Sequence, residues 1–246
     1  MKTSERHHLK ENDLALVLAR AQVWFGTNAK ALAIAAIAVV LLIAGVAGYV
    51  AWQASIENDA RARLAAAMVT YESRVMPPAP SSTPDQPTMT GQMPGTFPSD
   101  RARLEAALPQ FLETADAFPG TNAARTARFH AAGVLVSLGR HDEAIAHYDQ
   151  LMSGRDLMAR TARLGKAEAH VQAGQYDEAI AVYTSLVGTP DAQLPAEGLL
   201  MELARVYQLA GRLDDARTTL TTIVEQHAES PFAPAARAAL DQITVS

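Results

Sequence analysis

Cysteine is absent from this chain of 246 residues. Its absence excludes disulfides and any metal or redox site built on thiolates. Basic residues are scarce in the longest part of the chain, where residues 99–246 carry thirteen Arg and Lys against nineteen Asp and Glu. Because an acidic domain has no surplus of cations with which to bind phosphate backbones, we expect no nucleic acid among its partners.

Catalytic motifs are missing as well. The sequence contains no Walker A loop, no G-x-S-x-G nucleophile elbow and no dinucleotide fingerprint. HDEAIAH at 141–147 superficially resembles the zinc motif H-E-x-x-H. Its histidines are six residues apart rather than four, so they do not share a helix face in that way. We therefore expect no enzyme activity, no catalytic residue, no bound metal and no cofactor.

Charge is absent from ALAIAAIAVVLLIAGVAGYVAW, residues 31–52. A helix rises about 1.5 Å per residue, so this run covers the roughly 30 Å hydrocarbon core of a bilayer. We expect a transmembrane helix over residues 29–52, in contact with lipid. The alternative is a cleaved signal peptide, whose apolar region is usually about 7–15 residues and follows a short basic segment.

Basic residues stand on both sides of this span. Lys10, Arg20 and Lys30 precede it, and Arg61 and Arg63 follow it. The small bias favours an N-terminus in the cytoplasm. The C-terminal domain would then lie outside the cytoplasmic membrane.

The segments flanking the span differ in character. Residues 1–28 form an N-terminal cytoplasmic segment in which apolar residues at helical spacing predict a short amphipathic helix. Residues 53–76 are rich in alanine and predict a helix. Residues 77–99 hold seven of the thirteen prolines and a single charge, Asp85. Because proline blocks helices and few side chains here fill a core, we predict a flexible insert.

Residues 100–246 read as helix after helix, and a short phrase recurs among them. LGRHDEAIAHYDQL at 138–151 aligns without a gap with AGQYDEAIAVYTSL at 173–186, and GRLDDARTTL follows at 211–220. The marker glycines are 35 and 37 residues apart.

Each position of the phrase has a structural reason. Glycine adopts the left-handed conformation at little cost and ends a helix. Asp142, Asp177 and Asp214 then stand where the next helix begins, and we expect them to cap it. A small residue lets antiparallel helices approach, and a bulky residue four positions on fills the same face. The repeat-defining residues are Gly139, Ala144, Tyr148, Gly174, Ala179, Tyr183, Gly211, Ala216 and Leu220.

A single hairpin cannot bury its apolar stripe, whereas stacked copies bury it against one another. The sequence therefore predicts an all-α protein, with an N-terminal transmembrane helix followed by an α-solenoid of helical hairpins over residues 100–246. SPFAPAARAALDQI at 230–243 reads as a terminal capping helix.

The repeat resembles the tetratricopeptide repeat. Ala132, Ala167 and Ala204, seven residues before each glycine, fit the small position of that family. In an earlier unit, Ala107 and Phe111 fit its small and aromatic positions, and the partner helix would lie at 53–75 with the proline-rich insert splitting the hairpin. The family tryptophan is missing from all three later copies, which are therefore degenerate.

The layout as a whole resembles the TPR-21 or YfgM-like family: a short N-terminal helix containing LKEND, one span, then degenerate repeats. Members are ancillary subunits of the Sec translocon, single-pass in the bacterial inner membrane with periplasmic repeats. The resemblance implies a chaperone-related interaction module whose partners are translocon subunits, periplasmic chaperones and unfolded clients. The alternative is a structural scaffold in another envelope assembly, such as outer-membrane biogenesis or cell division.

In the resembling fold, the first helix of each hairpin lines a concave groove that binds protein partners. Arg205 is the one basic residue at the groove positions transferred by register, so capture of a terminal carboxylate is not expected. The apolar members suit an extended polypeptide, but for any one of them packing between neighbouring helices is the favoured interpretation. The groove residues implied by the resemblance are Thr126, Phe129, Val136, Leu164, Glu168, Val171, Met201, Arg205 and Gln208.

Overall fold

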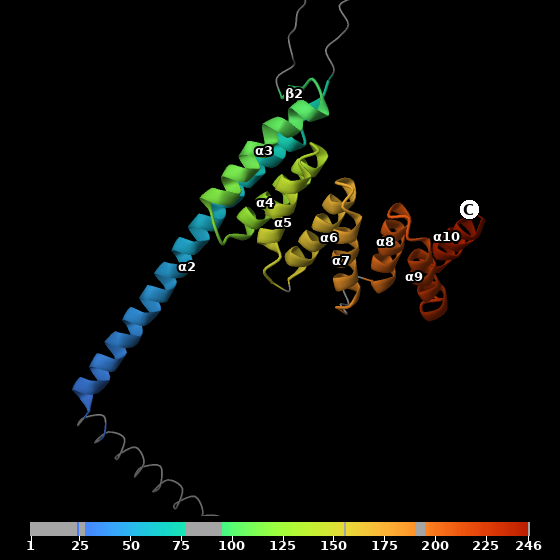
Figure 1. Ribbon diagram of the computed structural model, residues 1–246. Helices are drawn as coiled ribbons and strands as arrows, with labels where there is room; N and C mark the ends of the chain where they lie inside the picture. The colour runs from blue at the N-terminus through green and yellow to red at the C-terminus, as the bar shows by residue number, and fades with distance from the viewer. Residues whose placement is uncertain (1–23, 25–27, 77–94, 155, 190–194, 246) are drawn as a thin grey trace, which may run out of the picture. The chain divides into compact units, whose positions relative to one another are not determined.

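The computed structural model describes residues 24, 28–76, 95–154, 156–189 and 195–245. The chain divides into two compact units, Met1–Ser55 and Ile56–Ser246. The amphipathic helix expected within residues 1–28, and most of the proline-rich segment expected at 77–99, lie outside the described residues. The helices (Figure 1) are α2 (Ala29–Tyr71), α3 (Asp100–Ala117), α4 (Asn122–Ser137), α5 (His141–Leu151), α6 (Leu157–Gln172), α7 (Tyr176–Val187), α8 (Ala196–Leu209), α9 (Leu213–Gln226) and α10 (Ala233–Val245).

The described part of the first unit is dominated by α2. Its charge-free turns leave large apolar side chains uncovered, and Leu41 and Leu42 are each 67% exposed. A continuous apolar surface of this length is unfavourable in water and matches a bilayer interior. Among the described residues, α2 is the one helix long and apolar enough to cross a membrane.

Helix α2 ends at Tyr71, before the end expected at residue 76. Beyond it, β1 (Arg74–Val75) pairs in parallel with β2 (Thr96–Phe97). The Met76 N–H adds a hydrogen bond of 2.8 Å to the Phe97 carbonyl oxygen. Pro77 and Pro78 follow directly, and the residue before a proline avoids the helical region. Met76 accordingly lies outside the helix, in the extended pairing with Phe97. The expected all-α architecture is confirmed.

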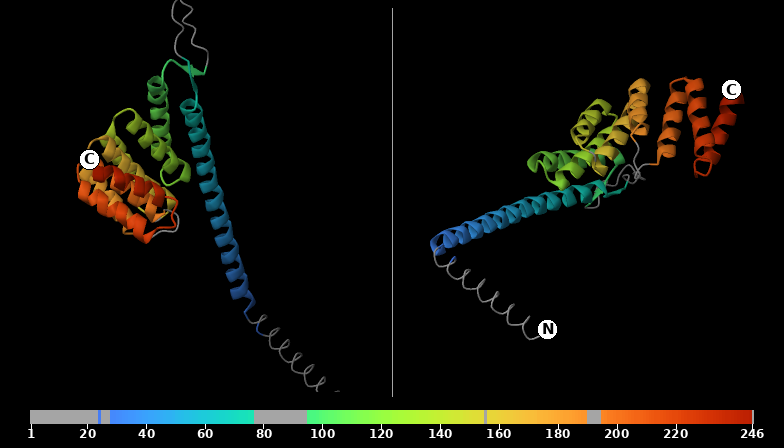
Figure 2. Two further views of the ribbon diagram at one scale, coloured as in Figure 1. Left: turned by 90° about the vertical axis from the view of Figure 1, so that its right-hand side faces the viewer. Right: turned by 90° about the horizontal axis from the view of Figure 1, so that it is seen from below.

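Helices α3 to α10 of the second unit stack in chain order. Each packs against its neighbour in sequence, and α4 also contacts α6. Figures 1 and 2 show from three directions that these helices lie side by side as successive hairpins. An α-solenoid of this kind buries its core between consecutive layers.

The corners inside the hairpins α4–α5, α6–α7 and α8–α9 are built alike. Gly139, Gly174 and Gly211 have φ of 78°, 75° and 74°, in the left-handed region that other residues rarely adopt. At the first corner, the Arg140 N–H donates to the Leu135 carbonyl oxygen at 2.9 Å and the Gly139 N–H donates to Val136 at 2.9 Å. The other two corners repeat this pair of hydrogen bonds. Both satisfy carbonyls that a helix end leaves without partners.

The expected side-chain caps at Asp142, Asp177 and Asp214 are not formed, and that prediction was wrong. The N-cap positions of α5, α7 and α9 are occupied by other residues, without a side-chain capping bond. The three aspartates stand two residues beyond the N-cap, inside the first turn, where they still favour the positive end of the helix dipole. Arg140 and Arg212 instead hold Glu143 and Asp215 at 2.6 and 2.7 Å.

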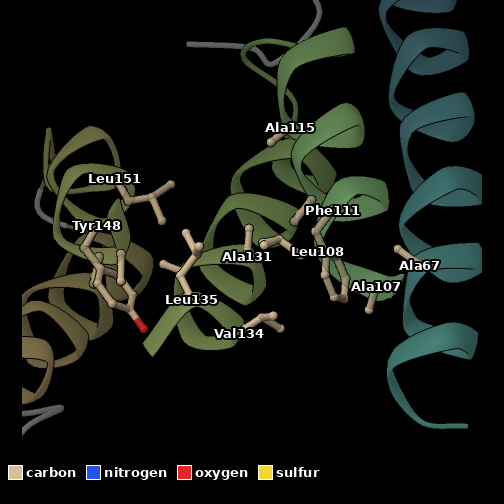
Figure 3. Packing of buried hydrophobic residues seen from close by; sticks show 14 of the residues in the cluster. Ala67, Ala107, Leu108, Phe111, Ala115, Ala131, Val134, Leu135, Tyr148 and Leu151 are labelled. Carbon is tan, nitrogen blue, oxygen red and sulfur yellow. The ribbon is translucent and has the colours of Figure 1, made fainter. Parts of the chain in front are cut away.

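Three clusters of buried side chains run along the second unit. The first surrounds Phe111, Leu135 and Tyr148 and includes Ala67 of α2 (Figure 3). Burying a side chain such as Phe111, which has no exposed surface, stabilises the fold by roughly 1.5–3 kcal/mol. The second cluster comprises Ala167, Val171, Ala179, Ile180, Tyr183, Leu186, Leu199, Leu203 and Val206. The third comprises Leu200, Ala204, Ala216, Leu220, Ile223, Ala236 and Ile243.

Candidate interaction groove

An open pocket of about 550 Å³ lies across the first helices of the three hairpins, α4, α6 and α8. Because the glycine corners reverse the chain after each of these helices, equivalent faces of the three helices follow one another along the stack. We refer to this pocket as the groove. It is lined by Phe129, Thr161, Leu164, Gly165, Glu168, Tyr183, Glu202 and Arg205.

The apolar part of the groove is built on an aromatic pair. The half-buried ring of Phe129 meets the buried ring of Tyr148 edge-on, with centroids 5.7 Å apart. Tyr148 in turn lies against the backbone of Gly165, where an added Cβ would stand 2.5 Å from Cζ of the ring. Gly165 is thus required for the close contact between α5 and α6. Leu164, half-buried, packs against the second cluster.

The polar part of the groove is an ion-pair network centred on Arg205. Its Nη2 donates to Oε2 of Glu168 at 2.9 Å, and its Nε donates to Oε2 of Glu202 at 2.8 Å. Glu168 also accepts a hydrogen bond from Gln172 at 3.1 Å. The three charged side chains remain partly exposed. With two carboxylates and one guanidinium, the groove carries a net negative charge.

Tyr183 adds a neutral phenol beneath these charges. Burial, and then the negative charges of Glu202 and Glu168, raise the pKa of Tyr183 to about 12, with Arg205 acting in the opposite sense. Its hydroxyl therefore stays protonated at physiological pH. Among the described residues, the ionised groups that line the groove are Glu168, Glu202 and Arg205.

The nine residues expected in the groove fall into two groups. Four of them line it: Phe129, Leu164, Glu168 and Arg205. The other five lie elsewhere in the stack. Val136 packs against the first cluster, Val171 is buried in the second, Met201 packs against the third, and Thr126 and Gln208 are half-buried outside the lining.

Of the other four lining residues, Thr161 stands at the position equivalent to Thr126 in the next repeat, and the remaining three were not expected there. Tyr183 was interpreted only as a repeat-defining core residue, and Gly165 carries no local signal for its role. Glu202 precedes Arg205 by three residues, so its place on the same helix face was available from the spacing.

Stacked helical hairpins with this corner geometry define a class, the α-solenoid repeat proteins. Within that class, one tetratricopeptide repeat profile matches residues 100–156 and 134–195, and a second matches residues 199–230. The chain is therefore a tetratricopeptide repeat protein. Repeats of this type form protein–protein interaction modules and typically serve as non-catalytic scaffolds.

No curated protein sequence matches the chain significantly. Among solved structures, it is similar to TPR-like repeats from Podosopora anserina, assigned to a kinesin light chain, with 18% identity and a TM-score of 0.49 over 57% of this chain and 77% of the other. It is also similar to a tetratricopeptide repeat protein from Parabacteroides merdae, with 17% identity and a TM-score of 0.45 over 59% and 55% of the two chains.

Proposed function

We propose that this protein is a membrane-anchored, non-catalytic interaction module whose groove binds an extended stretch of polypeptide. The observation that carries the proposal is the groove itself. Tetratricopeptide repeats bind proteins, and here the first helices of successive hairpins bring apolar, aromatic and charged side chains to one open surface. An extended segment can lay alternate side chains on such a surface, because successive side chains of an extended chain point in opposite directions.

We further propose that residues 29–52 anchor the chain in the bacterial inner membrane, with residues 1–28 cytoplasmic and the repeats periplasmic. Support comes from the exposed apolar surface of α2 and from the bias of basic residues toward the N-terminal side. A topology reporter fused after Ser246 tests the orientation. Activity of a reporter that works only in the cytoplasm would contradict it.

The partners proposed here are translocon subunits, periplasmic chaperones and unfolded clients of the Sec pathway. The proposal rests on the resemblance of the whole layout to single-span ancillary translocon subunits. Co-purification of the full chain in mild detergent tests it, and translocon subunits and periplasmic chaperones are expected in the eluate. Recovery of outer-membrane biogenesis or division proteins in their place would favour a scaffold in one of those assemblies.

A further inference from the structure

The groove has the wrong electrostatics for an anion. The Nε and Nη2 donors of Arg205 are already engaged by Glu202 and Glu168 at 2.8 and 2.9 Å. A guanidinium has five N–H donors, so an acidic group can still reach the remaining donors of Arg205. It would then lie beside the carboxylates of Glu202 and Glu168, whose like charges repel it and lower its affinity.

A cation meets the opposite situation. Carboxylates accept several hydrogen bonds each. Arg205 donates to Oε2 of Glu202 and Oε2 of Glu168, Gln172 donates to Oε1 of Glu168, and both carboxylates remain partly exposed with lone pairs left to accept from a cation. Lys166 of α6 is paired with Asp149 at 2.6 Å and is not among the residues that line the groove. The surrounding repeats are acidic as well, with thirteen basic against nineteen acidic residues over 99–246. This field draws positively charged segments toward the groove.

The same groove offers a contact for an apolar side chain. Phe129 and Leu164 line the groove and are both half-buried. Because Gly165 has no side chain, the Tyr148 ring packs against its backbone and against Phe129. Aromatic rings and a leucine present apolar surface to an incoming aliphatic or aromatic group. The apolar and acidic parts belong to one pocket, so one ligand segment contacts both.

We propose that the groove recognises an extended segment carrying an apolar or aromatic side chain close to a Lys or Arg. Phe129 and Leu164 contact the apolar group, and Glu202 and Glu168 bind the cation. The inference rests on the proposed function and adds the chemical class of the ligand to it. Arg205 sets the strength of the preference, because it neutralises part of the acidic charge.

The test is a series of variants in which the net charge of the groove changes by one unit at a time. Substitution R205Q makes the groove −2, the natural chain is −1, E202Q makes it 0, and the double variant E168Q/E202Q makes it +1. Two fluorescent peptides with the same apolar residues are compared, one with Lys and one with Glu at the adjacent position. Their binding to the full chain in nanodiscs is measured by fluorescence anisotropy at low and high salt.

We expect the natural chain to bind the Lys peptide more tightly. The ratio of the two affinities should change by about threefold for each unit of groove charge, and the preference should reverse in the double variant. High salt should reduce the differences in this affinity ratio between the variants. The matched control is E143Q, which changes the net charge of the chain by the same unit on α5, outside the groove, and should leave the ratio unchanged.

Two results would overturn the inference in distinguishable ways. If both peptides bind equally well and the ratio of their affinities is the same in every variant, the groove binds polypeptide but does not select cations. Only this inference then fails. If neither peptide binds any variant while circular dichroism shows a folded chain, the proposed function fails with it. A natural preference for the Glu peptide also contradicts the assignment of Glu202 and Glu168.

Discussion

At the scale of single residues, Asp156 joins two repeats. It is the N-cap of α6, and its Oδ1 accepts a hydrogen bond of 2.9 Å from the Ala159 N–H. Arg125 of α4 donates to both carboxylate oxygens, at 2.6 and 3.1 Å. The hydrogen bonds from Arg125, and then the backbone N–H, lower the pKa of Asp156 to about 2. One exposed carboxylate thus serves as a helix cap and as a link between neighbouring hairpins.

Because its pKa is lowered in the folded state, Asp156 should account for part of the unfolding free energy that the fold loses at acid pH. A carboxyl group with a depressed folded-state pKa contributes stability that is present above its unfolded value, near 3.8, and is lost as the pH falls toward 2. Asp156→Asn keeps a capping side chain but has no charge to titrate. We expect the variant to lose less unfolding free energy between pH 4 and pH 2, measured by urea titrations in detergent.

Arg125→Gln is the matched control for this experiment. It removes the larger cause of the lowered pKa and leaves the Ala159 N–H in place, so it should reduce the acid sensitivity only partly. The double variant should behave as Asp156→Asn does. An unchanged loss of unfolding free energy in Asp156→Asn would show that the ion pair contributes nothing in solution.

At the scale of elements, the contact between α5 and α6 depends on one ring and one missing side chain. Tyr148 is a buried residue of α5, and Gly165 lies in the middle of α6. Gly133 of α4 faces the hydroxyl of the same tyrosine, but a Cβ there would stand 3.8 Å from it, an ordinary contact distance. The two glycines therefore provide a matched pair around a single side chain.

Substituting each glycine by alanine should have opposite effects on stability. In Gly133→Ala the gain in helix propensity, up to about 1 kcal/mol, is not opposed by a clash. In Gly165→Ala the new methyl group would lie 2.5 Å from the Tyr148 ring, and overpacking of this kind costs about 1–3 kcal/mol. Urea unfolding of both variants measures the difference. Equal stabilisation by the two alanines would mean that α5 and α6 separate easily.

At the scale of the second unit, stability is distributed along the stack. Val187 and Tyr207 pack against both the second and the third cluster, so adjacent clusters share residues at their border. The first cluster is formed by residues up to Ala169. Repeat arrays of this kind gain stability from each unit and from its contacts with the nearest neighbours.

A cavity in the third cluster should therefore loosen one end of the stack more than the other. Ile223 has no exposed surface, and truncating such a side chain to alanine costs about 2–5 kcal/mol. In Ile223→Ala we expect faster amide hydrogen exchange in α8–α10 and a smaller change in α3–α5, measured by mass spectrometry. The control Phe111→Leu should show the converse pattern. Equal acceleration across α3–α10 in both variants would indicate a single cooperative unit.

The fold was predictable because its signals are local and repeated. Glycine, a small residue and a bulky residue recur at fixed spacing, and each acts within about one turn of chain. The aspartate caps were mispredicted because the observed N-cap lies two residues before each aspartate, and the spacing of the repeat does not fix a helix start to within two residues. Strands β1 and β2 have two residues each, and their sequence carries no periodic signal.

The groove was predictable only in part. Glu168 and Arg205 occupy equivalent positions in successive repeats, 37 residues apart, so register alone places them beside one another. The contact between the Tyr148 ring and Gly165 depends instead on the axial offset between α5 and α6. Val171 is buried in the second cluster with side chains of α7 and α8, a contact that the register of the repeat does not specify.

The bridge between Arg74–Val75 and Thr96–Phe97 has a consequence for engineering and for natural length variation. Residues 74–76 and residues 96–97 lie side by side, and the Met76 N–H donates a 2.8 Å hydrogen bond to the Phe97 carbonyl oxygen. The two ends of the intervening segment are therefore held together. When two ends are already pinned, doubling the length between them costs only about 0.6 kcal/mol of closure entropy. A fluorescent tag or a whole extra module inserted there should leave the hairpin of α2 and α3 undisturbed.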